Sequence, residues 1–130
     1  MPICAWYRRP LSKDSSLEPV DLPKDLVAAS AAPLVLTILS RGESYGYAIL
    51  AQVRELSGGR LAWKDGMLYP VLHRLERNGW VVAFLRDSDE GRRRRYYRIT
   101  PSGRRCLAEH RNQWQLVTEV LGLAWEGSRV

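Results

Sequence analysis

The sequence has few of the residues that build cross-links or metal sites. Only two of its 130 residues are cysteines, and only two are histidines. Cys4 and Cys106 have no metal-ligand spacing and are too few for a disulfide framework, so we expect free thiols in a reducing compartment. Neither histidine has a ligand partner four residues further on, which argues against a metal site.

Long apolar runs are also missing. No stretch of about 18 apolar residues exists, which excludes a membrane-spanning helix. The first ten residues have a short apolar start that ends at Arg8 and Arg9. A signal peptide instead begins with basic residues and continues with a longer apolar segment. These features predict a cytoplasmic protein.

Patterns that would indicate an enzyme are absent as well. The chain has no glycine-rich phosphate loop, no nucleophile elbow and no carboxylate pair with suitable neighbours. Asp87, Asp89 and Glu90 do cluster, but we expect them to be solvated on a turn. We therefore expect no catalytic activity and no cofactor.

What the sequence does have is an excess of arginine. Twenty basic residues stand against fourteen acidic ones, which gives a formal charge of +6. Arg92, Arg93, Arg94, Arg95 and Arg98 fall within a single short segment. Such a cluster indicates either a polyanion such as nucleic acid as partner or a solubilising surface, and charge alone leaves both open.

The first half of the chain divides into an arm and three helices. Residues 1–22 contain several prolines and serines without periodicity, and we interpret them as a flexible arm. A helix is expected over 23–41, kinked or split by Pro33 near residues 29–33. A second is expected over 44–57, with Ser44 as its N-cap. A third is expected over 65–78, with Asp65 as its N-cap and Gly79 at its end.

The second half predicts a hairpin and one long helix. Residues 80–85 and 94–99 are rich in β-branched and aromatic residues, which indicates two strands joined by a turn. Of Tyr96 and Tyr97, one side chain should be buried and one should face outward. Thr100 and Pro101 are typical of a helix start. Apolar residues then recur at steps of three and four, a heptad pattern that predicts a dimer seam. The seam residues are Leu107, His110, Trp114, Val117, Leu121 and Ala124.

This order of elements predicts a mainly α fold with a small β-hairpin. It is the order of a winged helix-turn-helix over residues 23–99, followed by a C-terminal dimerisation helix over 100–126 and a tail over 127–130. In such a unit the third helix lies in the major groove and the hairpin contacts the adjacent backbone. If Leu68, Leu72 and Leu75 face inward, the outward face carries Met67, Tyr69, His73, Arg74 and Arg77.

Several motifs resemble the PadR-like transcriptional regulators. They are Ser44-Tyr45-Gly46-Tyr47, Gly66-Met67-Leu68-Tyr69-Pro70, Leu72 to Gly79, and the segment Gly91 to Thr100. The resemblance covers residues 22–125 and is nearest to the short subfamily with one C-terminal helix, which includes multidrug-sensing members. It implies a dimer on a palindromic operator, acting as a repressor that a small aromatic ligand releases.

The resemblance and the expected fold together define three sets of residues. The expected DNA contacts are Ser44, Tyr45, Tyr47, Lys64, Met67, Tyr69, Pro70, His73, Arg74, Arg77, Arg92, Arg93, Arg94, Arg95 and Tyr96. The ligand contacts that the resemblance implies are Leu26, Ser30, Pro33, Trp114, Val117 and Thr118. The dimer contacts are the seam residues given above. The alternative is a ligand-binding or protein-interaction module that uses this fold without specific DNA binding.

Overall fold

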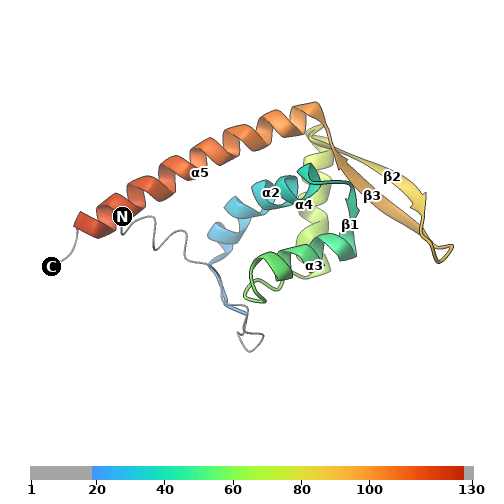
Figure 1. Cartoon of the computed structure of the whole chain (residues 1–130), viewed down its shortest axis with the longest axis horizontal. Helices are drawn as coiled ribbons and strands as arrows, with labels where there is room; N and C mark the ends of the chain where they lie inside the picture. Colours follow the sequence, from blue (N-terminus) through green and yellow to red (C-terminus); the bar gives the residue numbers. More distant parts are fainter. Residues whose placement is uncertain (1–18, 128–130) are drawn as a thin grey trace.

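The computed structural model describes residues 19–127 of the chain. Cys4, most of the expected arm and the last three residues of the expected tail lie outside this range. The elements in chain order are α2 (Lys24–Ser40), β1 (Ser44–Tyr45), α3 (Gly46–Leu56), α4 (Asp65–Arg77), β2 (Val81–Asp87), β3 (Arg93–Ile99) and α5 (Pro101–Gly127). The fold is mainly helical with a small sheet, as the sequence predicts (Figure 1).

Helix α2 supplies much of the core. Val35, Leu36 and Leu39 on this helix are buried against α3, α4 and the sheet. The helix runs through Pro33 without interruption, so the expected split near residues 29–33 is wrong. A proline inside a helix costs about 3 kcal/mol, whereas each fully buried apolar side chain contributes about 1.5–3 kcal/mol. Burial of this helix therefore outweighs the loss of one backbone hydrogen bond.

Helix α3 begins two residues later than the sequence predicts. Ser44 lies in the short strand β1, and Tyr45 occupies the N-cap position without a side-chain cap. The prediction of Ser44 as N-cap is wrong because its backbone is extended and pairs with Tyr97 of β3. Gly58 and Gly59 have positive φ angles and follow the end of the helix.

Helix α4 has the inner face that the sequence predicts. Leu68, Leu72 and Leu75 are completely buried, and Gly79, with a φ of 76°, follows the end of the helix. Asp65 is the first helical residue rather than the cap, because Lys64 holds the N-cap position. A carboxylate in the first turn still interacts favourably with the helix dipole.

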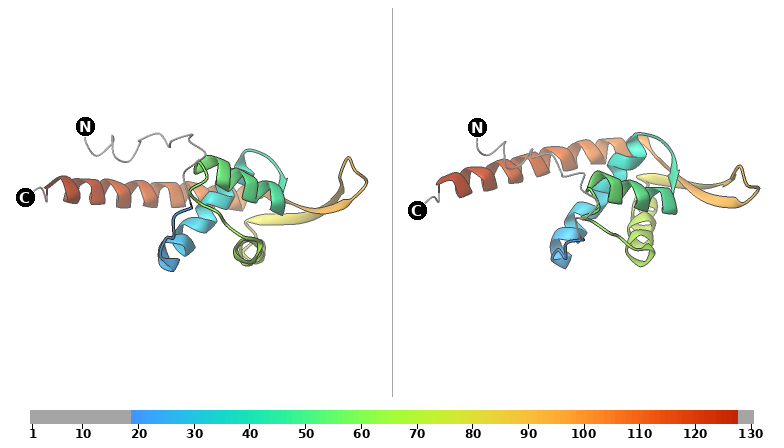
Figure 2. Two further views of the ribbon diagram at one scale, coloured as in Figure 1. Left: turned by 90° about the horizontal axis from the view of Figure 1, so that it is seen from below. Right: turned by 60° about the horizontal axis from the view of Figure 1, so that its bottom comes forward.

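The sheet has three antiparallel strands in the order β1-β3-β2. The hairpin register runs from Val81 opposite Ile99 to Asp87 opposite Arg93, so both strands extend further towards the turn than expected. Tyr97 is completely buried and Tyr96 half-buried, which confirms that the two side chains differ. The hairpin projects from the helices on the side opposite to the free end of α5, in both views of Figure 2.

Helix α5 begins at a well-formed cap. The Thr100 hydroxyl accepts a hydrogen bond from the Gly103 N–H at 3.0 Å and donates one to the Gly79 carbonyl at 2.7 Å. The first turns pack on the domain, where Gly103 meets the Trp80 carbonyl. The rest of the helix extends beyond the domain (Figure 1). Leu107, expected in the dimer seam, instead lies in this chain's own core because it belongs to these packed turns.

Residues 19–127 contain neither a candidate membrane span nor a candidate metal site. No helix in this range is both long and apolar enough to cross a membrane. No group of three histidine, cysteine or acidic side chains in the range could hold a metal ion. Cys106 is a free, half-buried thiol, and its burial raises its pKa.

Candidate nucleic-acid interface

The outward face of α4 carries polar and aromatic side chains opposite the buried leucines. The exposed residues on or directly before this helix include Lys64, Tyr69, Pro70, His73, Arg74 and Arg77. Met67 differs from the expectation, because it is half-buried and packs against the core. It lies one turn before Val71, which is buried as well. Met67 is therefore the least accessible of the expected DNA contacts on α4.

A hollow of 460 Å³ lies where α3, α4 and β3 meet. Its lining residues are Tyr45, Gly46, Tyr47, Tyr69, Arg92, Arg94 and Arg95. Gly46 is the first residue of α3, and a Cβ there would lie 2.5 Å from the Tyr69 hydroxyl. The missing side chain therefore lets Tyr69 lie against the start of α3. Arginines and the positive end of the helix dipole together make the hollow attractive to anions.

Aromatic rings connect the middle of the hairpin to the start of α3. The rings of Tyr45 and Tyr96 are 5.2 Å apart, and those of Tyr96 and Phe84 are 5.9 Å apart. The Arg94 guanidinium lies 4.5 Å from the centre of the Tyr45 ring. A guanidinium over a ring is partly immobilised while its N–H groups stay available to an anion.

The other hairpin arginines differ in their ion pairs. Arg95 lies 3.1 Å from Glu76 of α4, and Arg93 lies 3.4 Å from Asp87. Glu43 pairs with Arg86 and, at 3.6 Å, with Arg98. Within residues 19–127, no carboxylate pairs with Arg92 or Arg94. These two arginines line the hollow, so their charges are the most available to a phosphate.

The remaining expected DNA contacts differ in accessibility. Tyr47 is 76% exposed at the start of α3. The Ser44 side chain is buried, so its hydroxyl is not presented to solvent, in contrast to the expectation. Tyr97 is completely buried in β3, and its hydroxyl has no hydrogen-bond partner among the described residues. Burial raises the pKa of Tyr97, and the nearby Arg95 guanidinium opposes that rise.

The free part of α5 exposes a broad apolar surface. The exposed side chains include Leu116, Val117, Val120, Leu121 and Leu123, and Trp125 near the end of the helix is exposed as well. Val117 and Leu121 belong to the expected seam, whereas Leu116, Val120 and Leu123 widen it. His110 and Trp114 are half-buried, and Ala124 is exposed. We refer to Leu116, Val117, Val120, Leu121 and Leu123 as the α5 apolar face.

The residues of the expected ligand set lie on two helices. Leu26, Ser30 and Pro33 belong to α2, which packs against α5. The Ser30 hydroxyl donates to the carbonyl of Leu26 at 2.8 Å. Trp114, Val117 and Thr118 belong to α5, where the Thr118 hydroxyl donates to the Trp114 carbonyl at 2.8 Å. Both hydroxyls therefore already have partners within their own helices.

Sequence reasoning missed some residues that shape this interface. Glu43 and Glu76 fix individual arginines, but each reaches the hairpin from a distant part of the sequence. Gly46 belongs to one of the motifs given above, but the motif does not show that the glycine makes room for the Tyr69 ring. The heptad steps could have indicated Leu116, Val120 and Leu123, because each neighbours a seam position.

Comparisons with known proteins agree on one family. The sequence pattern described as "Transcriptional regulator PadR-like family" matches residues 35–109. An uncharacterised protein of Lysinibacillus sphaericus is 30% identical over 103 residues, which cover 79% of this chain and 94% of that protein. The transcriptional regulator Rv3488 of Mycobacterium tuberculosis is 49% identical over 70 residues, which cover 53% of this chain and 64% of that protein.

Solved structures give the same result. A transcriptional regulator from Clostridium thermocellum has a TM-score of 0.70 and 31% identity, and the match covers 75% of this chain and 95% of that one. A PadR family transcription regulator from Clostridium difficile has a TM-score of 0.65 and 29% identity, with coverages of 73% and 97%.

Proposed function

The chain belongs to the PadR-like family of transcriptional regulators, whose pattern covers residues 35–109, and we propose that it acts by binding double-stranded DNA through α4 and the hairpin. Its family is one of regulators, not of enzymes. In this proposal α4 enters the major groove. His73 and Arg74 are exposed on its outward face and are the residues that we assign to base edges.

The hollow between α3, α4 and β3 is the observation that supports this proposal most strongly. It gathers Tyr47, Tyr69, Arg92 and Arg94 at the start of a helix. A helix start with convergent N–H donors and arginines is suited to one backbone phosphate. Such a contact would fix the register of α4 on the duplex without reading sequence itself.

We further propose that the protein is a homodimer joined through the α5 apolar face. The exposed leucines and valines on this face would lose contact with water in a dimer. A two-fold axis would place two α4 helices about 34–36 Å apart, which fits a palindromic operator. The contacts that we propose are His110, Trp114, Val117, Leu121 and Ala124, together with Leu116, Val120 and Leu123.

The last part of the proposal concerns regulation. We propose that the regulator represses transcription and that a flat aromatic ligand beside Trp114 releases it from the operator. Val117 and Thr118 on α5, with Leu26, Ser30 and Pro33 on α2, would complete this site. A ligand there can change the angle between the two α5 helices, and hence the spacing of the two α4 helices, only if it binds one spacing better than the other.

The hairpin assignment predicts a specific loss of DNA affinity. Arg94→Ala should weaken binding to any duplex and reduce the log–log salt slope by about 0.9, because one phosphate contact is lost. Fluorescence anisotropy with a labelled duplex over a series of salt concentrations measures both quantities. Arg98→Ala is the matched control, because Arg98 lies on the same strand but pairs with Glu43 outside the hollow.

Two results would contradict the proposal. Equal losses of duplex affinity in Arg94→Ala and Arg98→Ala would mean that the hollow holds no phosphate. Absence of duplex binding by the unmodified protein at low salt would instead favour the alternative, a ligand-binding or protein-interaction module.

A further inference from the structure

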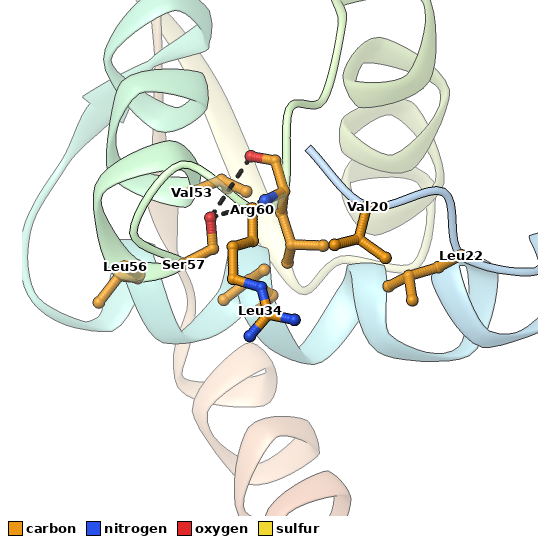
Figure 3. A pocket seen from close by; sticks show the side chains of 8 residues that line it. Val20, Leu22, Leu34, Val53, Leu56, Ser57 and Arg60 are labelled. Carbon is orange, nitrogen blue, oxygen red and sulfur yellow. Dashed lines mark hydrogen bonds between the residues drawn. The ribbon is translucent and has the colours of Figure 1, made fainter. Parts of the chain in front are cut away.

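A second pocket shares no lining residue with the proposed DNA and dimer contacts. It has a volume of 340 Å³ and opens between the segment before α2, α2 itself, the end of α3 and the loop after it (Figure 3). Its lining residues are Val20, Leu22, Leu34, Val53, Leu56, Ser57, Arg60 and Leu61. Six of these eight residues are valines or leucines, so the walls are aliphatic.

Hydrogen bonds hold the walls of this pocket in place. The Val20 N–H donates to the Arg60 carbonyl at 2.9 Å, which ties the segment before α2 to the loop. The Ser57 hydroxyl accepts from the Leu61 N–H at 2.8 Å, and the side chain of Ser57 is itself buried (Figure 3). A ligand would therefore meet a formed pocket rather than having to order the loop.

Arg60 adds one positive charge to these aliphatic walls. Arg60 is an exposed lining residue, and in Figure 3 its side chain extends across the pocket in the direction of α2. No carboxylate between residues 19 and 127 forms an ion pair with it. A single guanidinium at the edge of an apolar pocket is complementary to a molecule with a hydrocarbon body and one anionic end.

We propose that this pocket binds a medium-chain aliphatic carboxylate, with its hydrocarbon chain between Leu34, Val53 and Leu61 and its carboxylate on Arg60. The volume sets the length, because an apolar cavity of about 150 Å³ holds benzene and this pocket is roughly twice that size. A saturated chain of about ten carbon atoms fits such a space. The lining contains no aromatic ring, so nothing in it favours stacking with a flat ligand.

This site goes beyond the proposed DNA-binding function and has no residue in common with the ligand site proposed beside Trp114. Leu56 and Ser57 lie at the end of α3, and the loop that follows them leads directly into α4. A bound carboxylate would therefore contact the connection between the two helices of the helix-turn-helix. Its binding can be measured without DNA, so failure of the DNA proposal leaves this test valid.

The test is isothermal titration calorimetry of the full chain with decanoate and with decanol. We expect one decanoate per chain. Arg60→Gln should weaken decanoate binding at least tenfold and leave decanol binding unchanged, because only the carboxylate needs the guanidinium. Leu56→Trp, at a half-exposed position on the rim, should block both ligands by filling the pocket. Arg104→Gln, an exposed arginine on α5, is the matched control and should change neither.

Three results would overturn the assignment. One is the absence of decanoate binding to the unmodified chain. A second is equal binding by the unmodified chain and Arg60→Gln. The third is binding that is lost in Trp114→Ala but kept in Leu56→Trp, which would place the carboxylate on α5.

Discussion

Two helical glycines differ in the atom that an added Cβ would contact. That atom decides whether the substitution affects stability. A Cβ at Gly103 would overlap the Trp80 carbonyl, which is itself held by the Thr100 N–H at 3.0 Å. A Cβ at Gly46 would instead meet the hydroxyl end of Tyr69, a side chain that is 40% exposed. Backbone cannot move aside without breaking the cap of α5, whereas a tyrosine side chain can rotate.

This contrast predicts that substitution by alanine lowers stability at Gly103 and DNA affinity at Gly46. Gly103→Ala should lower the free energy of unfolding by about 1–3 kcal/mol, because it overpacks a fixed contact. Gly46→Ala should change it by less than about 1 kcal/mol but lower DNA affinity, because Tyr69 leaves the hollow. Gly66→Ala, with open space at its Cβ, is the stability control. Urea denaturation and anisotropy separate the two effects; a large loss of stability in Gly46→Ala would contradict the argument.

Because Tyr97 is buried, we expect the free energy of unfolding to depend on pH in alkaline solution. Burial raises its pKa above the ordinary value of 10.0, so at higher pH the folded chain keeps a proton that the unfolded chain releases. The free energy of unfolding should therefore fall as the pH rises above 10. Tyr97→Phe should remove this contribution and should stabilise the protein by about 1 kcal/mol at pH 7, because a buried hydroxyl without a partner is eliminated.

Urea denaturation at pH 7 and at pH 10.5 measures both effects of this substitution. Tyr96→Phe is the control, because Tyr96 is half-buried on the other face of β3. Destabilisation by Tyr97→Phe at pH 7 would mean that the hydroxyl makes a favourable interaction after all.

At the scale of elements, periodicity predicted the faces well, whereas local cap preferences were right for Thr100 and wrong for Ser44 and Asp65. Leu68, Leu72 and Leu75 were identified because a helix with one apolar stripe has only one way to bury it. Ser44 and Asp65 were misplaced as caps because a cap depends on where the backbone turns, which tertiary contacts decide. Strand β1 has only two residues, too few for any alternating pattern.

The candidate site was predictable to a similar extent. Exposure of His73 and Arg74 follows directly from the buried stripe of α4. The division of the arginines into paired and available ones was not predictable. It depends on Glu43 and Glu76, which meet the hairpin only after the chain has folded. Leu107 was assigned to the seam because a heptad pattern does not say where packing within the chain ends and packing between chains begins.

Helix α5 carries the prediction about assembly. Leu121 is 40% exposed on the α5 apolar face, so Leu121→Glu should convert a dimer into a monomer by placing a charge in the buried seam. Sedimentation velocity at micromolar concentration measures the change, and circular dichroism checks that the helix persists. Gln115→Glu, an exposed polar position on the same helix, should remain dimeric. A monomeric unmodified protein would contradict the proposed dimer.

For the whole molecule, the proposals connect the α5 helices with the DNA-binding surface. Trp114→Ala should keep the dimer, because Leu116, Val120 and Leu121 remain in the seam, but should abolish the response to flat aromatic compounds. In the unmodified protein such a compound should lower DNA affinity 5- to 150-fold, the usual range for coupling of about 1–3 kcal/mol. Anisotropy titrations with and without the compound test this, and a response that survives in Trp114→Ala would place the aromatic site elsewhere.

The pairing of β1 with β3 also has a consequence for the order in which the protein folds. Ser44 and Tyr97 are partners although roughly 50 residues separate them along the chain. Contacts between such distant residues form late, because the intervening loop must first be closed at an entropic cost. The hollow at the start of α3 is therefore completed only after α4 and the hairpin have folded. A nascent or partly unfolded chain would lack it and would not compete with the native protein for DNA.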